Sequence, residues 1–177
     1  MIRINIKETI RAYFFMNPTA KVRLRHLERE TNLPFPSVVR YAKELAEEDI
    51  LKISLISGVK LYSADRTSKR FLLEKKMFNI RRLYDCDLID YIIEEYNNPA
   101  IVLFGSFSKG EDIEKSDIDI YIQTPQKTIK NLDKFEKKLQ RKIQIFQSRK
   151  LTEIKNKDLA NNIVNGVVLN GFMEVFE

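Results

Sequence analysis

The sequence predicts an α+β protein in which an N-terminal helical domain, a connecting helix and a C-terminal α/β domain follow one another. Three short helical patterns and two β-rich runs fill the first third of the chain, and residues 65–84 form one long helical pattern. After residue 85, strand-like and helix-like runs alternate. A chain of 177 residues is long enough for two small domains that each bury a core. We therefore expect domains at residues 1–64 and 85–177, joined by the helix at 65–84.

The composition is that of an ordinary soluble globular protein, with 44% hydrophobic and 32% charged residues. No segment approaches the roughly 18 consecutive apolar residues that cross a bilayer. Residues 1–15 are too charged for a signal peptide, so we expect a cytoplasmic protein without a membrane partner. Residues 1–63 carry 11 basic and 7 acidic side chains, within a net charge of +6. This excess favours a nucleic-acid partner, although a solvated basic surface would also account for it.

The chain has one cysteine, Cys86, and one histidine, His26. A single cysteine forms no disulfide framework and no cysteine-based metal site, so Cys86 is expected to be structural. His26 lies in a polar helical stretch with no second His or Cys at ligand spacing, and is expected at the surface.

The N-terminal elements follow from apolar spacing and from the residues that interrupt it. Asn17-Pro18 ends a first helix, and Thr31 to Pro34 ends a second. Ser57-Gly58 separates two β-rich runs and predicts a hairpin turn. The expected elements are helices at 4–15, 24–30 and 37–48, a short strand at 21–23, and hairpin strands at 50–57 and 59–63. This order resembles a winged helix-turn-helix domain, a DNA-binding architecture.

The resemblance to winged helix-turn-helix domains implies that the third helix enters the major groove of DNA. The acidic C-terminal end of this helix, Glu44 to Asp49, would repel phosphates, so only its N-terminal half is expected to face DNA. The alternative is a winged helix that contacts protein. The expected DNA contacts are Ser37, Arg40, Tyr41 and Lys43 on the helix and Lys60 on the wing, with Arg23 and Arg25 nearer the DNA backbone.

The connecting helix carries an apolar stripe at helical spacing. Such a stripe needs a partner, and DNA-binding proteins of this architecture commonly bind as dimers, so we expect a homodimer. The stripe consists of Leu73, Met77, Ile80 and Tyr84. A further helix, capped by Asp85 or Asp87, is expected to end at Asn97-Asn98-Pro99.

The C-terminal domain is organised around residues 100–123. Ala100 to Phe104 is a short apolar run between Pro99 and Gly105, which predicts a buried strand. Gly105 lets the backbone approach a bulky anion, and Ser106 adds a hydroxyl beside the N–H groups that open the next short helix. This turn is therefore a candidate phosphate site.

From Ser116 onward the side chains alternate as they do in a strand. One face carries Ile118, Ile120 and Ile122, and the other carries Asp117, Asp119 and Tyr121. Two neighbouring carboxylates repel each other unless a cation lies between them, and hard oxygen ligands of this kind suit Mg²⁺ bound with substrate phosphates. A solvated polar strand face is the simpler interpretation of the two aspartates alone, but the Gly-Ser turn upstream favours the metal site.

Six of these residues fit the pattern G-S-x3-G-x5-S-D-x-D of the polymerase β-like nucleotidyltransferase superfamily. The chain is most similar to the minimal nucleotidyltransferases of that superfamily, over about residues 85–175. The resemblance implies that the glycines and serines bind the nucleotide and that the two aspartates are catalytic and hold metal. It implies Mg²⁺ and a nucleoside triphosphate, with ATP expected. The six residues are Gly105, Ser106, Gly110, Ser116, Asp117 and Asp119.

One position departs from the family pattern. The family places a third carboxylate on the next central strand, which is expected here at residues 142–147, and the aligned residue is Gln144. Glutamine is a neutral ligand and no general base, so its presence weakens two-metal phosphoryl transfer. A nearby acid, Asp133 or Glu136, is a candidate substitute.

Two functions therefore remain open. The first is a Mg²⁺-dependent nucleotidyltransferase that transfers a nucleoside monophosphate to a protein or another hydroxyl acceptor and carries a DNA-binding winged helix. The second is a transcription regulator of the antitoxin type, catalytically weak or inactive, that uses the fold for nucleotide sensing or protein binding. Relatives of the minimal type often pair with an all-helical toxin, so the resemblance also implies a helical protein partner or substrate.

The remaining C-terminal pattern predicts a helix, a third strand and a last helix around a small mixed sheet. The first helix is expected at 127–139, with Ile129, Leu132, Phe135 and Leu139 inward. The last helix is expected at 159–169, with Ile163, Val167 and Leu169 buried.

Overall fold

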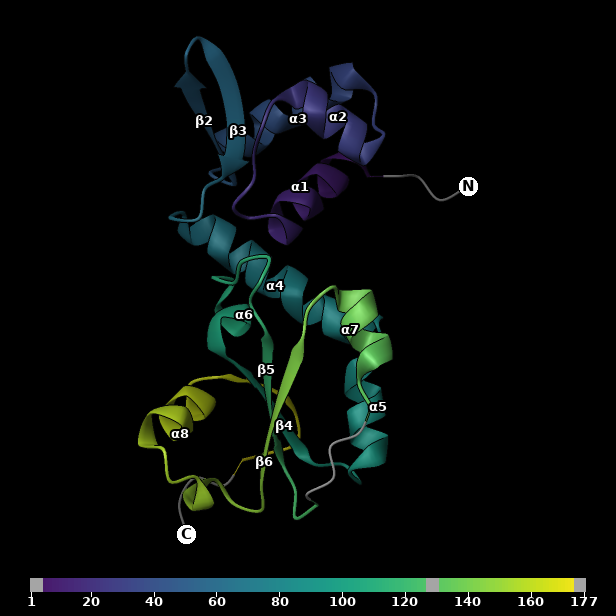
Figure 1. Ribbon diagram of the computed structural model, residues 1–177, viewed down its shortest axis with the longest axis vertical. Coiled ribbons are helices and arrows are strands. Elements are labelled where there is room, and N and C mark those ends of the chain that lie inside the picture. The colour runs from purple at the N-terminus through teal and green to yellow at the C-terminus, as the bar shows by residue number, and fades with distance from the viewer. Residues whose placement is uncertain (1–4, 127–130, 174–177) are drawn as a thin grey trace. The chain divides into compact units, whose positions relative to one another are not determined.

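The computed structural model describes residues 5–126 and 131–173 (Figure 1). Its contacts divide the chain into two compact units, Met1–Phe78 and Asn79–Glu177, and each is described by itself. The mixed α+β class expected from the sequence is confirmed. The division falls within helix α4 (Lys69–Asp85), and the finer division at 64/65 and 84/85 stays a prediction.

The N-terminal unit contains three helices, a small sheet and the first part of α4. Its other elements are α1 (Ile6–Met16), β1 (Lys21–Val22), α2 (Leu24–Thr31), α3 (Phe35–Glu47), β2 (Leu51–Ile56) and β3 (Val59–Ala64). The sheet is antiparallel in the order β1-β3-β2, with β2 at an edge. Ser57 and Gly58 join β2 to β3 with positive φ angles of 48° and 75°, which is the backbone expected of a tight hairpin. This order of elements agrees with the order expected from the sequence.

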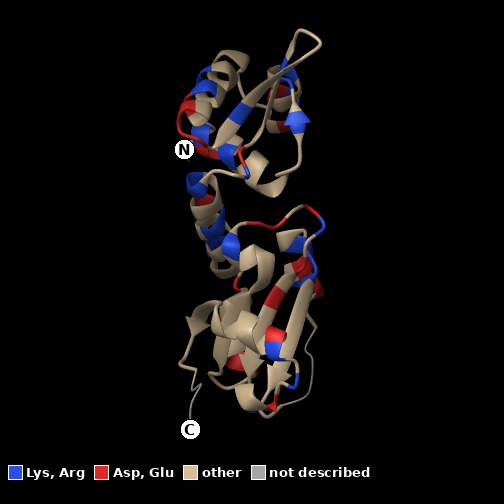
Figure 2. Cartoon of the chain, turned by 90° about the vertical axis from the view of Figure 1, so that its left-hand side faces the viewer, with Lys and Arg blue, Asp and Glu red and all other residues tan. Residues whose placement is uncertain are grey.

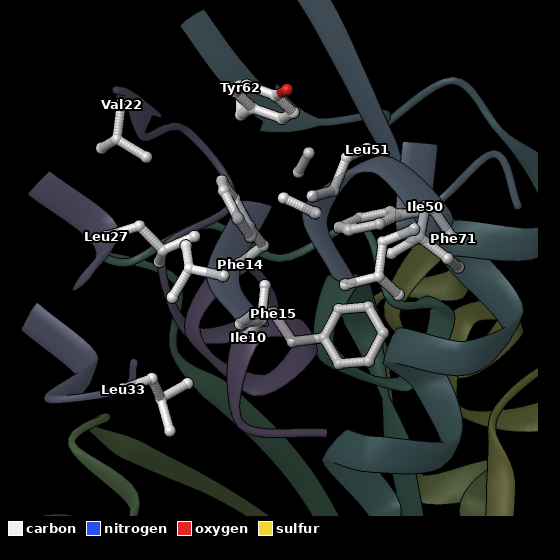
Figure 3. Packing of buried hydrophobic residues seen from close by; sticks show 14 residues of the cluster. Ile10, Phe14, Phe15, Val22, Leu27, Leu33, Ile50, Leu51, Tyr62 and Phe71 are labelled. Atoms are coloured by element: carbon white, nitrogen blue, oxygen red, sulfur yellow. The ribbon is translucent and has the colours of Figure 1, made fainter. Parts of the chain in front are cut away.

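One apolar core holds the N-terminal unit together (Figure 3). Ile10 and Phe14 are four residues apart on α1, so both lie on the face that packs inward, and both are fully buried. Phe71 of α4 joins the same core and packs edge-on against Phe15. The helices begin and end where the sequence allows: Asn5 accepts a hydrogen bond from Glu8 N at the start of α1, and α2 ends at a left-handed Asn32.

The C-terminal unit is built around a four-stranded sheet in the order β6-β5-β4-β7. Its elements are α5 (Leu88–Glu95), β4 (Ala100–Phe104), α6 (Gly105–Lys109), β5 (Ile118–Gln123), α7 (Asp133–Leu139), β6 (Ile143–Ser148), a 3₁₀ turn (Leu151–Glu153), α8 (Lys157–Val164) and β7 (Val167–Asn170). Strands β5 and β6 are parallel, whereas β4 pairs antiparallel with both β5 and β7. The expected small mixed sheet is therefore present.

Both faces of this sheet are covered. Helices α5 and α7 lie on one side, where Ile118 and Ile120 are fully buried, and α8 lies on the other (Figure 1). Tyr121 points to the α8 side and is also fully buried. The strand face that carries Asp119 is therefore core for most of its length, and the aspartates stand at its end rather than on a solvated polar face.

The last predicted helix is wrong beyond Val164. Residues 167–170 form β7, which pairs with β4, so Val167 and Leu169 lie on a strand instead of a helical stripe. Gly166 makes the change possible, because a Cβ at this position would lie 2.6 Å from the carbonyl oxygen of Leu103. Val167 and Leu169 are two residues apart, a spacing that fits a strand as well as a helix. Pairing with the edge of β4 that does not contact β5 favoured the strand.

Smaller differences concern helix ends. The helix expected at 65–84 begins at Lys69, and the one expected at 127–139 is described from Asp133, because residues 127–130, and with them Ile129, lie outside the described residues. Asp87 precedes α5 as expected but makes no side-chain cap. No helix in the described part of the chain is long and apolar enough to cross a membrane.

Charged residues are distributed differently in the two units (Figure 2). Lysine and arginine are frequent on the helices of the N-terminal unit, whereas the strands of the C-terminal sheet are mostly uncharged. The single cysteine and histidine behave as expected: Cys86 is buried, and burial raises the pKa of its thiol, whereas the His26 side chain is exposed.

Candidate functional site

The candidate site lies at one end of the C-terminal sheet. Strand β4 ends there, and β5 and β6 begin there, because both run opposite to β4. The register pairs Phe104 with Asp119 across β4 and β5, and Asp119 with Gln144 across β5 and β6. The Gly-Ser turn that follows Phe104 therefore lies beside Asp119, and Gln144 stands on the other side of that carboxylate.

Gly105 and Asp119 fix each other's position. Gly105 has a φ of +72°, and a Cβ built on it would lie 2.2 Å from Oδ2 of Asp119. A side chain at this position would be strained by the backbone angle and would displace the carboxylate, so glycine is strongly favoured. The glycine therefore places the backbone at the start of α6 directly against the Asp119 side chain.

The two aspartates differ in environment. Asp117 precedes β5 and is exposed, whereas Asp119 lies within β5 and is half-buried. Burial raises the pKa of Asp119, and the neighbouring charge of Asp117 raises it further. Within residues 5–126 and 131–173, neither carboxylate has a basic partner at ion-pair distance. The site thus holds two acids without a direct ion pair, although Lys142 lies near enough for the charge of Asp117 to raise the pKa of its amine.

This donor set fits a divalent cation. Asp119, whose ionised form is disfavoured by burial and by the charge of Asp117, and Asp117 itself are hard oxygen ligands, and a bound cation would relieve both the burial cost and the repulsion at Asp119. A third acid is missing at the register position next to Asp119, where Gln144 is exposed. In the described part of the chain, no group of three Asp, Glu, His or Cys residues forms a metal cluster.

The candidate substitute Glu136 is committed elsewhere. Its carboxylate accepts a hydrogen bond from Nζ of Lys142 at 2.6 Å and another from the backbone N–H of Ile143 at 3.0 Å. Lys142, and then the N–H of Ile143, lower the pKa of Glu136. A carboxylate stabilised in this way is a weak base, so Glu136 helps to anchor the start of β6 instead of replacing the third acid.

The other motif residues shape the loop between α6 and β5. Gly110 ends α6 with a φ of +75°, and Oγ of Ser116 accepts a hydrogen bond from the backbone N–H of Ile113 at 3.0 Å. Ser106 lies in the first turn of α6 and is half-buried. The nucleotide contacts expected of these residues stay predictions, but each residue stands where it positions the turn or the loop.

Sequence reasoning missed the residues that brace this turn. Oγ of Ser108 donates a hydrogen bond to the carbonyl oxygen of Gly105 at 2.8 Å. Nδ2 of the buried Asn79 donates to the carbonyl oxygen of Phe107 at 3.0 Å and to Oδ1 of Asp112 at 2.7 Å. The spacing of Ser108 three residues after Gly105 was an available signal, whereas the approach of Asn79 depends on the fold.

A pocket of about 420 Å³ opens next to the aspartates. It borders Ser116 and Asp117 but not Gly105, Ser106 or Asp119, so it adjoins the site without containing all of it. Its other lining residues are Glu114, Lys115, Asp133, Glu136, Lys137, Gln140, Arg141 and Lys142.

The expected DNA-contacting residues occupy two places in the N-terminal unit. Arg40 and Lys43 are exposed on α3, and Ser37 and Tyr41 are half-buried there, with Tyr41 packed against the core. Lys60 is exposed on β3 and lines a separate groove together with Arg23 and Arg25.

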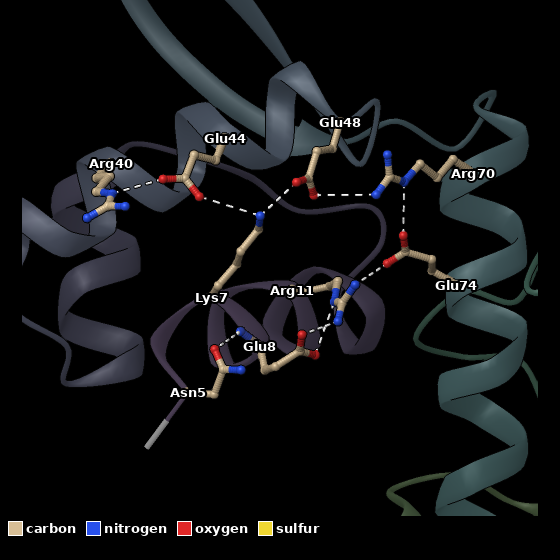
Figure 4. A network of polar contacts seen from close by, with 9 residues as sticks. All are labelled: Asn5, Lys7, Glu8, Arg11, Arg40, Glu44, Glu48, Arg70 and Glu74. Carbon is tan, nitrogen blue, oxygen red and sulfur yellow. Dashed lines mark hydrogen bonds and ion pairs between the residues drawn. The ribbon is translucent and has the colours of Figure 1, made fainter. Parts of the chain in front are cut away.

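Two of the four acidic residues at the end of α3, Glu44 and Glu48, are paired with basic side chains within the protein (Figure 4). Nε of Arg40 donates to Glu44 at 2.9 Å, and Nζ of Lys7 lies 3.5 Å from Glu44 and 2.7 Å from Glu48. Arg70 contacts Glu48 at 3.8 Å. These pairs reduce the repulsion that the acidic residues alone would exert on a phosphate backbone.

Comparison with known families agrees with the site. Residues 87–171 match the family model described as Polymerase beta, Nucleotidyltransferase. Searches of the curated proteins and of the solved structures found no match. The match and the fold support a polymerase β-like nucleotidyltransferase domain in this part of the chain, as the Gly105 to Asp119 motif indicated. Members of this family generally use a nucleoside triphosphate and a divalent metal.

Proposed function

We propose that the C-terminal unit binds a nucleoside triphosphate, with ATP expected, together with Mg²⁺, and transfers the nucleoside monophosphate to a protein or another hydroxyl acceptor. One observation carries the proposal: the Gly105 backbone lies against the Asp119 carboxylate, next to Asp117. The proposed phosphate site and the proposed cation site are thereby adjacent, as transfer from a triphosphate requires.

Each residue has a distinct part in this proposal. The backbone of Gly105 and the hydroxyl of Ser106 bind and orient phosphate oxygens, because no side chain of residue 105 stands in the way. Asp117 and Asp119 hold Mg²⁺, which when bound supplies the positive charge that offsets the developing charge on the phosphoryl group. Ser108 keeps the turn in place through its hydrogen bond to Gly105 O.

Calorimetry with ATP tests the cation site. We expect affinity to fall when Mg²⁺ is omitted and to fall as far in a double variant with Asp117→Ala and Asp119→Ala. The matched control is Asp90→Ala with Glu94→Ala, which removes two exposed acids from α5 and should leave ATP affinity unchanged. Equal affinity with and without Mg²⁺, or in wild type and the aspartate variant, would sink the proposal.

A second candidate function is favoured by Gln144. An amide in the register position beside Asp119 supplies neither charge nor a base, which suits a protein that binds nucleotide without turning it over. In that case the fold serves nucleotide sensing or protein binding in a transcription regulator of the antitoxin type. Nucleotide binding with no transfer to the protein or to a co-expressed helical partner is the result that would favour this candidate.

We further propose that the N-terminal unit is a winged helix that binds DNA through the N-terminal half of α3. Its order of elements and its hairpin support this, and the pairing of Glu44 and Glu48 with Lys7 reduces the repulsion expected from the acidic end of α3. The proposed contacts are Ser37, Arg40, Tyr41, Lys43 and Lys60.

Affinity of the full chain for duplex DNA, titrated against salt, tests the winged helix. Contacts to phosphate release counterions, so affinity should fall steeply with salt, and Arg40→Ala with Lys43→Ala should flatten the slope. Arg66→Ala with Lys69→Ala removes the same charge from exposed positions outside α3 and serves as the control. DNA affinity that does not change with salt would favour the alternative in which the N-terminal unit contacts protein.

We also propose a homodimer through α4, which two of the four residues of the expected apolar stripe support by their exposure. Leu73 and Met77 are 60% and 57% exposed. Ile80 instead packs against the core of the C-terminal unit, and the Tyr84 hydroxyl donates to the carbonyl oxygen of Leu169 at 2.8 Å. Sedimentation of wild type beside Leu73→Ser with Met77→Ser tests it, and an unchanged monomer in both would exclude this surface.

A further inference from the structure

The N-terminal unit has a groove between α2 and β3, here called the α2–β3 groove, with a volume of about 430 Å³. Every charged residue in its lining is a lysine or an arginine, and its remaining residues are apolar or aromatic apart from one histidine. None of the expected α3 contacts belongs to it. The lining residues are Arg23, Leu24, Arg25, His26, Arg29, Phe35, Val59, Lys60 and Tyr62.

Two of the three arginines of this groove, Arg25 and Arg29, are held in position by their neighbours. The guanidinium of Arg25 stacks over the Phe35 ring at 3.6 Å and pairs with Glu28 at 3.1 Å. Nε of Arg29 donates to the carbonyl oxygen of Arg25 at 3.3 Å. Positioned cations lose less side-chain entropy when they bind an anion, so this wall is preorganised for negative charge.

An apolar strip continues the groove along the hairpin. The register pairs Ile53 with Tyr62 and Leu55 with Lys60, and directly opposed residues of antiparallel strands share a face. Ile53 and Leu55 are 46% and 68% exposed, beside a groove whose base is already apolar. Exposed aliphatic side chains gathered beside a pocket mark an interaction surface.

The combination of charge and apolar surface selects the class of partner. A phosphate backbone would satisfy the arginines but would gain nothing from Ile53 and Leu55. An acidic peptide segment with apolar side chains matches both, because its carboxylates meet the arginines and its apolar groups cover the strip. We propose that the α2–β3 groove binds an acidic, amphipathic segment of a partner protein, independently of DNA binding by α3.

Selection of short random peptides displayed on phage, with the full chain as bait, tests this proposal. We expect the enriched peptides to combine Asp or Glu with Leu, Ile, Phe or Trp. The strongest peptide, made synthetically, should lose about tenfold or more in affinity, or roughly 1.4 kcal/mol, with Arg23→Glu and Arg29→Glu. Leu55→Ser should weaken the same peptide without changing charge.

The controls separate this groove from the proposed DNA surface. Arg66→Glu with Lys69→Glu makes the same change of charge at exposed positions outside the groove, and should leave peptide affinity unchanged. Lys60 is not varied, because it lies in the groove and among the proposed DNA contacts. Arg23 was also expected near the DNA backbone, so DNA affinity of the Arg23→Glu, Arg29→Glu variant is measured beside its peptide affinity. All varied residues are exposed, and thermal melting verifies folding.

Three results would overturn the proposal: enriched peptides without acidic residues, peptide binding that survives the groove variants, or displacement of the peptide by random-sequence duplex DNA whose binding also needs Arg23 and Arg29. The last result would make the groove a DNA phosphate site. Loss of DNA binding in the α3 variant with peptide affinity intact would leave the two surfaces independent, as proposed.

Discussion

Three glutamates of the N-terminal unit and the two site aspartates of the C-terminal unit have opposite surroundings. In the N-terminal unit, Glu44, Glu48 and Glu74 each meet a lysine or an arginine, and Arg11 joins Glu74 to Glu8 (Figure 4). In the C-terminal unit, Asp117 and Asp119 face each other without a basic partner among the described residues. Paired charges hold helices together, whereas unpaired acids at the end of a sheet cost stability and are available to a ligand.

The difference also separates two kinds of glycine. Gly58 and Gly105 have nearly the same φ, 75° and 72°. A Cβ added to Gly58 would have no atom within 4 Å, whereas a Cβ added to Gly105 would lie 2.2 Å from Oδ2 of Asp119. Only Gly105 therefore contributes to the candidate site. The following predictions test these contrasts.

The largest effect is expected from Gln144→Asp. A carboxylate beside Asp119 would add charge and a base at the position where the family has its third acid, and two such contributions amount to on the order of a hundredfold or more in transfer rate. The assay follows labelled nucleotide from ATP to the protein or to a co-expressed neighbour, wild type beside variant. Strong wild-type transfer that the substitution leaves unchanged would show that another residue acts as the base.

Gly105→Ala should separate the two glycines. We expect it to lower the free energy of unfolding by about 1–3 kcal/mol, from the strained φ and the displaced Asp119 carboxylate, and to abolish detectable ATP binding. Gly58→Ala should cost only the backbone strain, about 1 kcal/mol, and leave ATP binding intact. Urea unfolding and calorimetry measure both, and equal losses in the two variants would contradict a special role for Gly105.

Asp119→Asn should stabilise the metal-free protein. Because burial and Asp117 raise the pKa of Asp119, its ionised form is disfavoured in the folded state. The penalty grows as pH rises from the ordinary pKa towards the raised one and is constant above it. At neutral pH we expect a gain on the order of 1 kcal/mol or less, seen as a higher melting temperature in chelator. The gain should vanish below pH 3.8, where the carboxyl is protonated in both states. Asp117→Asn changes an exposed position and should raise the melting temperature less than Asp119→Asn does. A larger rise for Asp117→Asn than for Asp119→Asn would contradict this explanation.

Lys7→Met should have the smallest effect. Lys7 links Glu44 and Glu48 at the surface, and such exposed pairs contribute about 0.2–1 kcal/mol that salt weakens. Glu48 raises the pKa of Lys7, so this contribution is present at neutral pH and disappears as pH rises through the raised value. Chemical denaturation in low and high salt measures it, and a loss that does not shrink with salt would show that packing of the lysine stem matters more.

Much of the C-terminal fold was predictable because its signals are local. The run from Ala100 to Phe104 lies between a proline and a glycine, and the structure has a strand with those bounds. The motif from Gly105 to Asp119 predicted the family, and the register confirms that Gln144 stands beside Asp119. Local spacing failed at Val167 and Leu169, where the same residues suit a helix or a strand.

The sequence by itself determined most of the elements, the two aspartates, the Gly-Ser turn and the resemblance to the family, because period, turn residues and motif spacing act over a few neighbouring residues. Only the tertiary structure decided that 167–170 pairs with β4, that Asp119 touches the Gly105 backbone, and that Lys7 pairs with two glutamates at the end of α3. These outcomes depend on which segments meet in space. A strand's pairing partner and a carboxylate's electrostatic surroundings are set by residues far away in the chain, and no local pattern records them.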